Sequence, residues 1–311
     1  NEPGIAPGAQ CDDPFECPFK TWCNSGIAQP ILPAYSLDVF ARMRTNIKDD
    51  LRAKGFEDAL QVPEHYLNET QRRIQRVSQT GAAELTPEAA QTLAGLAYPR
   101  YYLDFETINL AIPRWALTSP YSTQVPFQWS CHIEDSSCQL QHEMFLDVSG
   151  DDPRRACAES LIQALGENGP VFVYFQAFEK GRIAELAALF PDLAPALNAI
   201  NVRIVDLLPL ARLSYYHPDM HGSWSIKAVL PTVAPDMDYS RLAVGNGGDA
   251  QAAYREILHR NTPDTRRQEL TDGLRDYCTL DTLAMVRLAW FLAGHVESPP
   301  SPNTAQQVTQ N

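Results

Sequence analysis

Residues 101–108 of the chain read YYLDFETI. This run of aromatic and β-branched residues predicts a β-strand, in which successive side chains point to opposite faces. Asp104 and Glu106 therefore project from one face, and their apolar neighbours place both acids inside a sheet rather than in a loop. Two buried, unpaired carboxylates are costly, and bound cations would remove that cost. The stretch predicts a central strand that carries a candidate cation site.

Two further segments resemble this one in composition: PFQWSCHIE over 126–134 and LQHEMFLD over 140–147. Turn-prone residues separate the three segments, which predicts an antiparallel three-strand meander. The pattern then alternates, with a helix expected over 152–165, a strand over 170–175, a helix over 178–190 and a strand over 202–208. A meander followed by such alternation indicates an α/β fold, with a mixed sheet flanked by helices.

The sequence pattern divides the chain into four segments. Residues 1–33 are Cys-rich and loop-like, because six prolines interrupt any helix. Residues 34–97 repeat apolar side chains at helical spacing and predict a small helical connector. Residues 98–295 hold the α/β domain, which ends in a long helix expected over about 263–293. Residues 296–311 are polar and predict a disordered tail.

Composition excludes several classes of protein. Hydrophobic residues make up 44% and charged residues 20% of the 311 residues, which excludes wholesale disorder and a fibre. Lys and Arg number 25 against 38 Asp and Glu, so the net charge of −13 argues against indiscriminate nucleic-acid binding. No run of 18 apolar residues predicts a membrane span.

The cysteine count bears on the compartment. Seven cysteines, an odd and sparse number, are more typical of a reducing, cytoplasmic environment than of a secreted disulfide framework. The chain opens at Asn1 with NEPGIAPGAQ, and we therefore expect a piece of a longer protein or a processed product.

The terminal helix carries a second pair of chemically active side chains. Tyr277 and Asp281 are four residues apart, so they lie on one helix face, which is otherwise apolar. On its own this pair would be read as a core tyrosine and a capping or ion-paired aspartate. Its position after a strand with Asp104 and Glu106 favours a shared site.

Taken together, three motifs resemble those of a known superfamily. DFET at 104–107, the acid of YFQAFEKGRI at 174–183 and YCTLD at 277–281 resemble the three exonuclease motifs of DnaQ-like proteins. The Tyr-x-x-x-Asp ending is similar to that of the DEDDy subgroup. VDLLPLAR at 205–212 also resembles a stretch often found after the second motif. The resemblance covers residues from about 98 to 293, in the family's order.

A closer resemblance is to an uncharacterised bacterial family in which a Cys-rich segment precedes such a domain. GSWSIKAVLP at 222–231 and GNGGDAQAAY at 245–254 have counterparts there. Fuller members resemble fusions to a RecB-like nuclease with an iron–sulfur cluster. The resemblance therefore implies an upstream RecB-like domain in a longer parent chain, and a role in DNA repair.

What the resemblance implies for this chain is an RNase H-like fold and a 3′–5′ exonuclease, a nuclease that hydrolyses phosphodiester bonds. The partner would be a single-stranded or frayed end of DNA or RNA. Tyr277 would orient the attacking water. Two Mg²⁺ or Mn²⁺ ions would be the cofactors, because hard cations prefer oxygen ligands. The implied metal ligands are Asp104, Glu106, Glu179 and Asp281.

The second motif departs from the usual pattern. Its acid is Glu179 rather than Asp, and Phe175 stands where an Asn is often found. Asp206 is an alternative acid, although capping of the following segment is the better explanation for it. These departures keep open a second hypothesis, a catalytically decayed RNase H-like module that binds nucleic acid or a partner protein.

Other side chains are candidates for substrate binding. Lys227 can meet the scissile phosphate, or it can be an ordinary solvated lysine. Phe105, Phe175 and Trp224 are candidates to stack on a base of a single strand. GNGG from Gly245 lacks the features of a phosphate-binding loop, and we interpret it as a turn.

The N-terminal cysteines form a C-x5-C-x5-C pattern of Cys11, Cys17 and Cys23. Three thiolates in a segment without a core indicate Zn²⁺ or an iron–sulfur cluster, but both normally take four ligands. The family resemblance favours a [4Fe–4S] cluster completed by a cysteine outside this chain; free thiols are the alternative. A third hypothesis makes this segment the functional centre. The remaining cysteines are interpreted as small core or surface residues: Cys131, Cys138, Cys157 and Cys278.

Overall fold

The computed structural model describes residues 5–11, 17–25, 33–40, 42–237, 239 and 242–295. The tail predicted over 296–311 lies outside these residues. Two compact units are present, Asn1–Gln75 and Arg76–Asn311.

The first unit is built from short helices. They are α1 (Lys20–Asn24), α2 (Thr45–Ala53), the start of α3 (Glu69–Thr80) and four 3₁₀ turns at Ala9–Cys11, Leu37–Val39, Ala59–Gln61 and Glu64–Tyr66. Leu37, Phe40 and Leu51 are buried, and the Gln75 side chain donates hydrogen bonds to two turn carbonyls. From residue 34 onward the predicted helical connector is confirmed in type, although 3₁₀ turns interrupt it. Residues 1–33 were predicted to be loop-like, and there α1 and the turn Ala9–Cys11 contradict the prediction, because Lys20–Asn24 lies between prolines rather than across one.

Residues 76–97, which the sequence pattern assigned to the connector, instead pack within the second unit. The reason is a long-range pairing that composition does not reveal. Strand β1 (Glu84–Leu85) pairs antiparallel with β7 (Tyr215–Tyr216). The Ala89 amide, in α4 (Glu88–Ala94), donates a hydrogen bond to Ser214 Oγ at 2.9 Å.

A five-stranded sheet forms the centre of the second unit, with the order β4-β3-β2-β5-β6. The pairs β2–β3 and β3–β4 are antiparallel, whereas β5 and β6 continue the sheet in parallel with β2. The predicted meander and the predicted mixed RNase H-like α/β fold are both confirmed. The strands are β2 (Arg100–Ile108), β3 (Val125–Glu134), β4 (Leu140–Leu146), β5 (Val171–Val173) and β6 (Ile204–Asp206).

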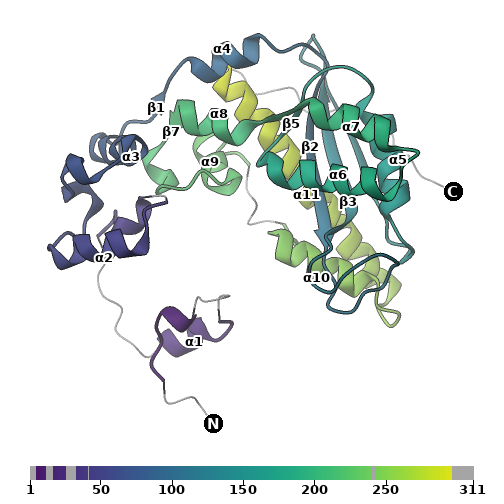
Figure 1. The fold of residues 1–311 in the computed structure, drawn as a ribbon, viewed down its shortest axis with the longest axis horizontal. Helices are drawn as coiled ribbons and strands as arrows, with labels where there is room; N and C mark the ends of the chain where they lie inside the picture. Colours follow the sequence, from purple (N-terminus) through teal and green to yellow (C-terminus); the bar gives the residue numbers. More distant parts are fainter. Residues whose placement is uncertain are drawn as a thin grey trace. The chain divides into compact units, whose positions relative to one another are not determined.

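Helices cover both faces of this sheet (Figure 1). One face is apolar and packs Leu103, Phe105 and Trp129 against α5 (Arg154–Leu165), α6 (Gln176–Leu189) and α7 (Ala194–Val202). The other face packs against α10 (Gly247–Ile257) and α11 (Asp264–Leu292). The remaining elements are α8 (Leu207–Ser214), the 3₁₀ turn Pro218–Met220 and α9 (Ile226–Val233).

The terminal helix matches the prediction to within one residue at each end. The predicted turn at GNGG is correct only for its first two residues. The Asn246 side chain accepts a hydrogen bond from the Asp249 amide, so this asparagine caps α10, and the helix begins at Gly247.

Strand β3 holds α11 through a row of polar side chains that are completely buried. Gln128 donates to the Leu274 carbonyl at 2.9 Å. Ser130 Oγ and His132 Nδ1 both bond the Thr282 hydroxyl, at 2.9 and 2.8 Å. Burial lowers the pKa of His132 to about 3, so its ring is neutral. Because period-2 alternation places all of them on one face of β3, this row determines where α11 lies along the sheet.

At the end of the row, Glu134 joins three elements. Its carboxylate accepts from the Tyr102 hydroxyl of β2 at 2.7 Å and from Trp290 Nε1 of α11 at 2.8 Å. Glu134 is fully buried, so each of these donors would be left without a partner if the carboxylate were removed.

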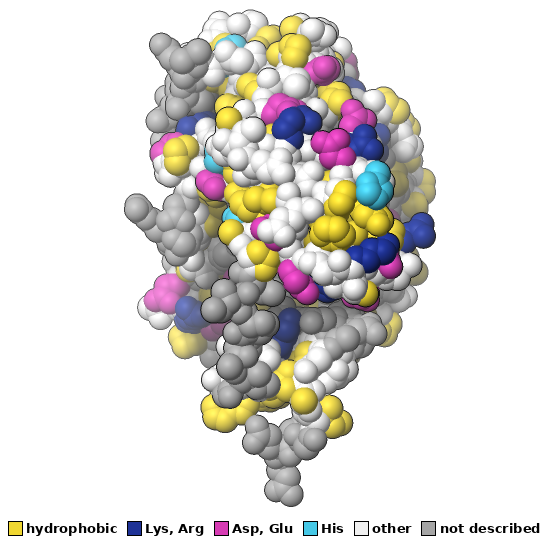
Figure 2. All heavy atoms as spheres, turned by 90° about the vertical axis from the view of Figure 1, so that its left-hand side faces the viewer, with side chains coloured by type: hydrophobic (Ala, Val, Ile, Leu, Met, Phe, Trp, Pro, Cys, Tyr) yellow, Lys and Arg dark blue, Asp and Glu magenta, His cyan; other side chains and the backbone are white. Residues whose placement is uncertain are grey.

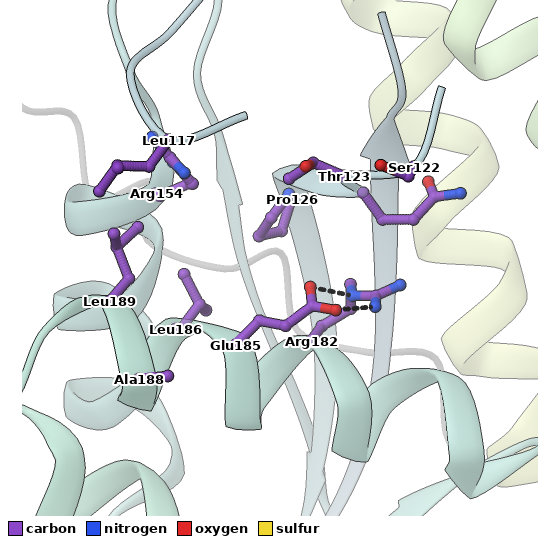
Figure 3. Close-up of a pocket in the computed structure, with 11 residues that line it drawn as sticks. Leu117, Ser122, Thr123, Pro126, Arg154, Arg182, Glu185, Leu186, Ala188 and Leu189 are labelled. Carbon is purple, nitrogen blue, oxygen red and sulfur yellow. Dashed lines mark hydrogen bonds and ion pairs between the residues drawn. The ribbon is translucent and has the colours of Figure 1, made fainter. Parts of the chain in front are cut away.

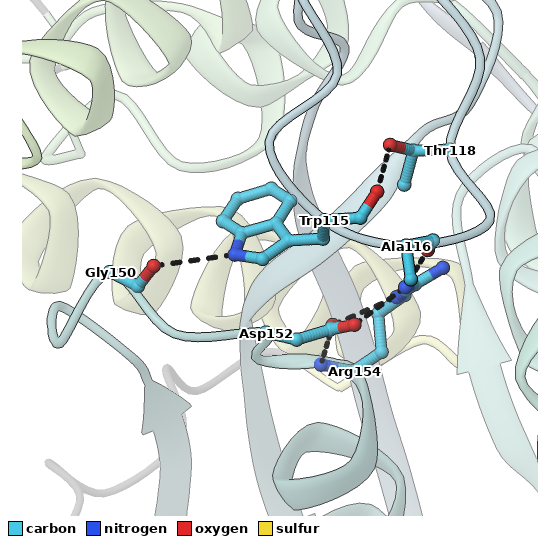
Figure 4. Close-up of polar contacts among 6 residues, drawn as sticks. All are labelled: Trp115, Ala116, Thr118, Gly150, Asp152 and Arg154. Atoms are coloured by element: carbon cyan, nitrogen blue, oxygen red, sulfur yellow. Dashed lines mark hydrogen bonds and ion pairs between the residues drawn. The ribbon is translucent and has the colours of Figure 1, made fainter.

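The loop that follows β2 is tied to the start of α5 (Figure 4). Trp115 Nε1 donates to the Gly150 carbonyl at 3.3 Å. The Arg154 guanidinium bonds the Ala116 carbonyl at 2.6 Å and pairs with Asp152. These contacts hold a loop that also exposes the hydrophobic side chains of Ile112, Leu117 and Tyr121.

Charges of both signs share the surface. On the face in Figure 2, the described Lys and Arg side chains lie beside Asp and Glu side chains rather than forming one broad basic area. Within the described ranges, no helix is long and apolar enough to cross a membrane.

Replacing Glu134 tests the anchoring of α11. The variant Glu134→Gln keeps the shape but leaves only one acceptor oxygen for two buried donors, so the free energy of unfolding should fall by about 1–3 kcal/mol. Urea denaturation followed by tryptophan fluorescence measures this. Glu143→Gln on the neighbouring β4, which is partly exposed, serves as the control. Equal urea midpoints for both variants and the unaltered chain would contradict the anchoring role.

Candidate functional site

Asp104 and Glu106 project from one face of β2, as the sequence predicted. That face packs against α11. Asp104 pairs with Ser130 across the sheet and Glu106 pairs with Gln128, so both acids share a face with the polar row of β3. Glu106 is 6% exposed. A Cβ built on Gly247 would lie 4.0 Å from Glu106 Oε2, so the first turn of α10 lies beside this carboxylate.

Helix α11 brings Tyr277 and Asp281 to the same place. The Asp281 carboxylate accepts a hydrogen bond from the Tyr239 hydroxyl at 2.6 Å and another from the Tyr277 hydroxyl. Between them along the helix, Cys278 places its Sγ 4.0 Å from Asp104 Oδ2. Asp104 and Asp281, which are 177 positions apart in the sequence, therefore face one centre.

Glu179 enters from the first turn of α6. Its side chain is 2% exposed, and its Oε2 has no hydrogen-bond partner within the part of the chain that the structure describes. The negative charge of Glu179 helps to raise the pKa of Asp104. Glu179 therefore lies at the edge of an acid cluster whose other members are Asp104, Glu106 and Asp281. A buried oxygen without a partner is costly, and a cation or a hydrogen-bond donor at this position would offset that cost.

Asp206, the alternative acid, has a structural role. Its carboxylate accepts from the amides of Phe175 and Gln176, both at 3.0 Å, and from the Leu208 amide at 3.0 Å. These bonds cap α8 and fix the turn that begins α6, where Phe175 adopts a left-handed φ of 82°. The capping interpretation accounts for Asp206, and Glu179 remains the acid of this segment.

Burial raises the pKa of every acid in the cluster, and repulsion from neighbouring acids of the cluster adds to the rise at Asp104 and Glu106. Loss of solvent, together with the charge of Asp281, raises the pKa of Glu106 to about 8. Burial raises the pKa of Glu179 to about 8. The pKa of Asp104 lies well above its ordinary value because of burial and the charges of Asp281, Glu106 and Glu179. Burial also raises the pKa of Asp281, although the two tyrosine hydroxyls oppose that rise.

Lys227 is a cation that acts on two of these acids. Its Nζ donates to the Gly245 carbonyl at 2.6 Å, lies 3.5 Å from the Tyr277 hydroxyl, and sits about 5 Å above the rings of Tyr239 and Tyr277. Its charge lowers the pKa of Glu106 and of Asp281. The structure therefore places Lys227 inside the site, not in open solvent.

The prediction that Phe105 and Trp224 can stack on a base is wrong. Phe105 is 3% exposed and packs in the apolar core with Trp129, because it points to the face opposite Asp104 and Glu106. Trp224 is 4% exposed, and its Nε1 donates to the Tyr215 carbonyl at 2.8 Å. Phe175 is 56% exposed and keeps an open face.

Two members of the site were missed by the sequence analysis. Cys278 was interpreted as a small core or surface residue, yet its position three residues before Asp281 is a signal that the two share a helix face. No sequence pattern around Tyr239 indicates a functional role, because only the path of the loop after α9 brings this residue to Asp281.

The arrangement can hold cations. Among the described residues, the ligating atoms of Asp104, Glu106 and Cys278 lie within 4.8 Å of one another, and the three N-terminal cysteines form no such group. Carboxylate oxygens suit Mg²⁺ or Mn²⁺. The raised pKa values and the unpartnered Glu179 oxygen both fit a site whose charge a cation balances. The iron–sulfur or zinc site at Cys11, Cys17 and Cys23 stays a prediction.

A pocket of about 410 Å³ lies between α6 and the loop that precedes β3 (Figure 3). Leu117, Leu186 and Leu189 form an apolar wall, and Arg182 closes another side through a bidentate pair with Glu185. Arg182 also lowers the pKa of Glu179, which lies one helical turn away on α6.

The acid cluster predicts an unusual dependence of stability on pH. Without cations, native Glu106 and Glu179 keep protons that the unfolded chain releases as pH rises above the ordinary value of 4.5. The free energy of unfolding should therefore fall as pH rises from about 4.5 to about 8. Urea denaturation in EDTA at both ends of this range measures the effect.

The matched variants are Glu106→Gln and, as the control, Glu167→Gln in the exposed loop after α5. Glu106→Gln should lose part of the pH dependence and become more stable than the unaltered chain at pH 8. An identical pH profile for the two variants would contradict the electrostatic description of the cluster.

Comparison with known proteins gives one match. A family model described as "Domain of unknown function (DUF2779)" matches residues 101–225. No curated protein and no solved structure matches the chain. The matched range contains β2 from its second residue onward, with Asp104 and Glu106, and α6 with Glu179, and it ends before Lys227 and α11. The site thus joins side chains from inside and outside the matched range.

Proposed function

We propose that the chain is a metal-dependent 3′–5′ exonuclease of the DnaQ-like type, which hydrolyses phosphodiester bonds at a single-stranded or frayed end. One observation carries the proposal. Three segments far apart in sequence deliver four acids and a tyrosine to one partly buried centre, in the order of the exonuclease motifs: Asp104, Glu106, Glu179, Tyr277 and Asp281.

The electrostatics support cation binding. Each acid is too buried to be ionised cheaply, and Lys227 alone cannot balance four carboxylates. Mg²⁺ or Mn²⁺, held by these acids, would activate a water molecule and stabilise the leaving oxygen. The donors are chiefly oxygens, as such hard cations require.

The chain's own residues have distinct tasks in this proposal. Burial and the nearby acids raise the pKa of Tyr277, so its hydroxyl keeps its proton and positions a water molecule rather than acting as a base. Lys227 lies beside that hydroxyl and offers a positive charge to a phosphate. Asp281 receives two tyrosine hydrogen bonds that orient its carboxylate.

The surroundings of the site suit an unstacked strand. Phe175 is exposed at the start of α6, four residues before Glu179, and offers a ring on which a base can stack. The pocket behind Arg182 combines an apolar wall with polar side chains at its mouth, a lining suited to a nucleoside.

Acid-to-amide variants test the activity. Asp104→Asn and Asp281→Asn should each lower the rate of strand shortening by about 10³-fold or more, because each removes a charge that holds a cation. End-labelled single-stranded DNA and RNA, incubated with Mg²⁺ or Mn²⁺, reveal 3′ shortening on a gel. Asp276→Asn, on the exposed side of the same helix next to Tyr277, is the matched control and should retain full activity.

Two results would contradict the proposal. One is cleavage that survives in Asp104→Asn, which would mean that a contaminant or another site acts. The other is the absence of cleavage with either metal and either nucleic acid. Strand binding without cleavage would instead support the decayed binding module.

Lys227 gives a separate prediction about binding. Lys227→Ala should raise KM for a single strand about ten-fold and reduce the slope of log affinity against log salt by about one, because one phosphate contact is lost. Fluorescence anisotropy at increasing NaCl measures the slope. Arg275→Ala, an exposed charge on α11 paired with Asp272, is the control. An unchanged slope in Lys227→Ala would exclude the phosphate contact.

A further inference from the structure

Cys278 is the one cysteine of the second unit that the structure places against carboxylates. Its Sγ lies 4.0 Å from Asp104 Oδ2 and within 4.8 Å of a Glu106 oxygen, and the side chain is completely buried. Cys131 and Cys157 are equally buried, but both pack in the apolar cluster on the opposite face of the sheet. A small apolar role therefore fits those two cysteines better than it fits Cys278.

The neighbouring acids point to a ligand at this position. Glu106 is 6% exposed, and within the described residues no donor makes a hydrogen bond to its carboxylate. Its oxygen, an Asp104 oxygen and Cys278 Sγ all face one small volume. Two acids and a thiol in mutual contact repel one another when ionised, whereas a divalent cation between them would satisfy all three.

We propose that Cys278 is a ligand of the cation held by Asp104 and Glu106, which makes this a mixed oxygen and sulfur site. Cysteine binds as the thiolate, so its proton is released to solvent when the cation binds. Sulfur is a soft donor, and the site would favour Mn²⁺, Co²⁺, Zn²⁺ or Cd²⁺ over Mg²⁺. The inference rests on the cation site of the proposed function but not on nuclease activity.

Absorption spectroscopy with Co²⁺ tests the sulfur ligand directly. Because Cys11, Cys17 and Cys23 can also bind Co²⁺, the full chain is used with all three changed to Ser. Addition of Co²⁺ should produce a sulfur-to-cobalt charge-transfer band in the near ultraviolet. The further change Cys278→Ser should abolish the band, whereas Cys138→Ser, a partly exposed cysteine outside the site, should leave it intact.

Affinity provides the second readout. Cys278→Ser should weaken Cd²⁺ binding by roughly ten-fold or more and change Mg²⁺ binding little, because only the soft cation loses a preferred donor. Cys278→Ala should behave in the same way, and far-ultraviolet circular dichroism checks that both variants fold. A loss of Cd²⁺ preference in both variants supports the inference.

The outcomes separate this inference from the proposed function. Co²⁺ binding without the charge-transfer band, or a band that persists in Cys278→Ser, overturns the sulfur ligand but leaves the exonuclease proposal standing. A Cys278-dependent band in a chain that cleaves no nucleic acid supports the ligand and overturns the exonuclease. Absence of Co²⁺ binding altogether overturns both the ligand and the cation site.

Discussion

The row of buried polar side chains on β3 is the interaction on which the rest of the second unit depends. Gln128, Ser130, His132 and Glu134 each need a partner once they are shut off from water, and α11 supplies one for each. A shift of α11 along the sheet would break several of these bonds at once. The helix therefore has one stable position, and that position determines which of its residues meet β2.

The position of α11 also determines the candidate site. With α11 held in place, Cys278 lies beside Asp104, and the charge of Asp281 raises the pKa of the buried Asp104. The fold tolerates the repulsion because two tyrosine hydroxyls and Lys227 offset part of it. A cation held there, as proposed above, would offset the remaining repulsion and stabilise the native state.

The start of α6 has a backbone conformation that Asp206 stabilises. Phe175 stands at a left-handed position that strains most side chains, and its amide is held by Asp206. The same carboxylate caps α8, so one residue shapes both helix starts. Glu179, in the first turn of α6, then lies at the edge of the acid cluster.

The sequence by itself determined the features that depend only on residues close together along the chain. Period-2 alternation placed Asp104 and Glu106 on one face of a strand, and the four-residue step placed Tyr277 and Asp281 on one face of a helix. Tertiary structure alone decided that these two faces meet. It also buried Phe105 and Trp224, brought in Tyr239, and joined residues 76–97 to the second unit. Those outcomes follow from long-range pairing and packing, for which neighbouring residues along the chain hold no signal.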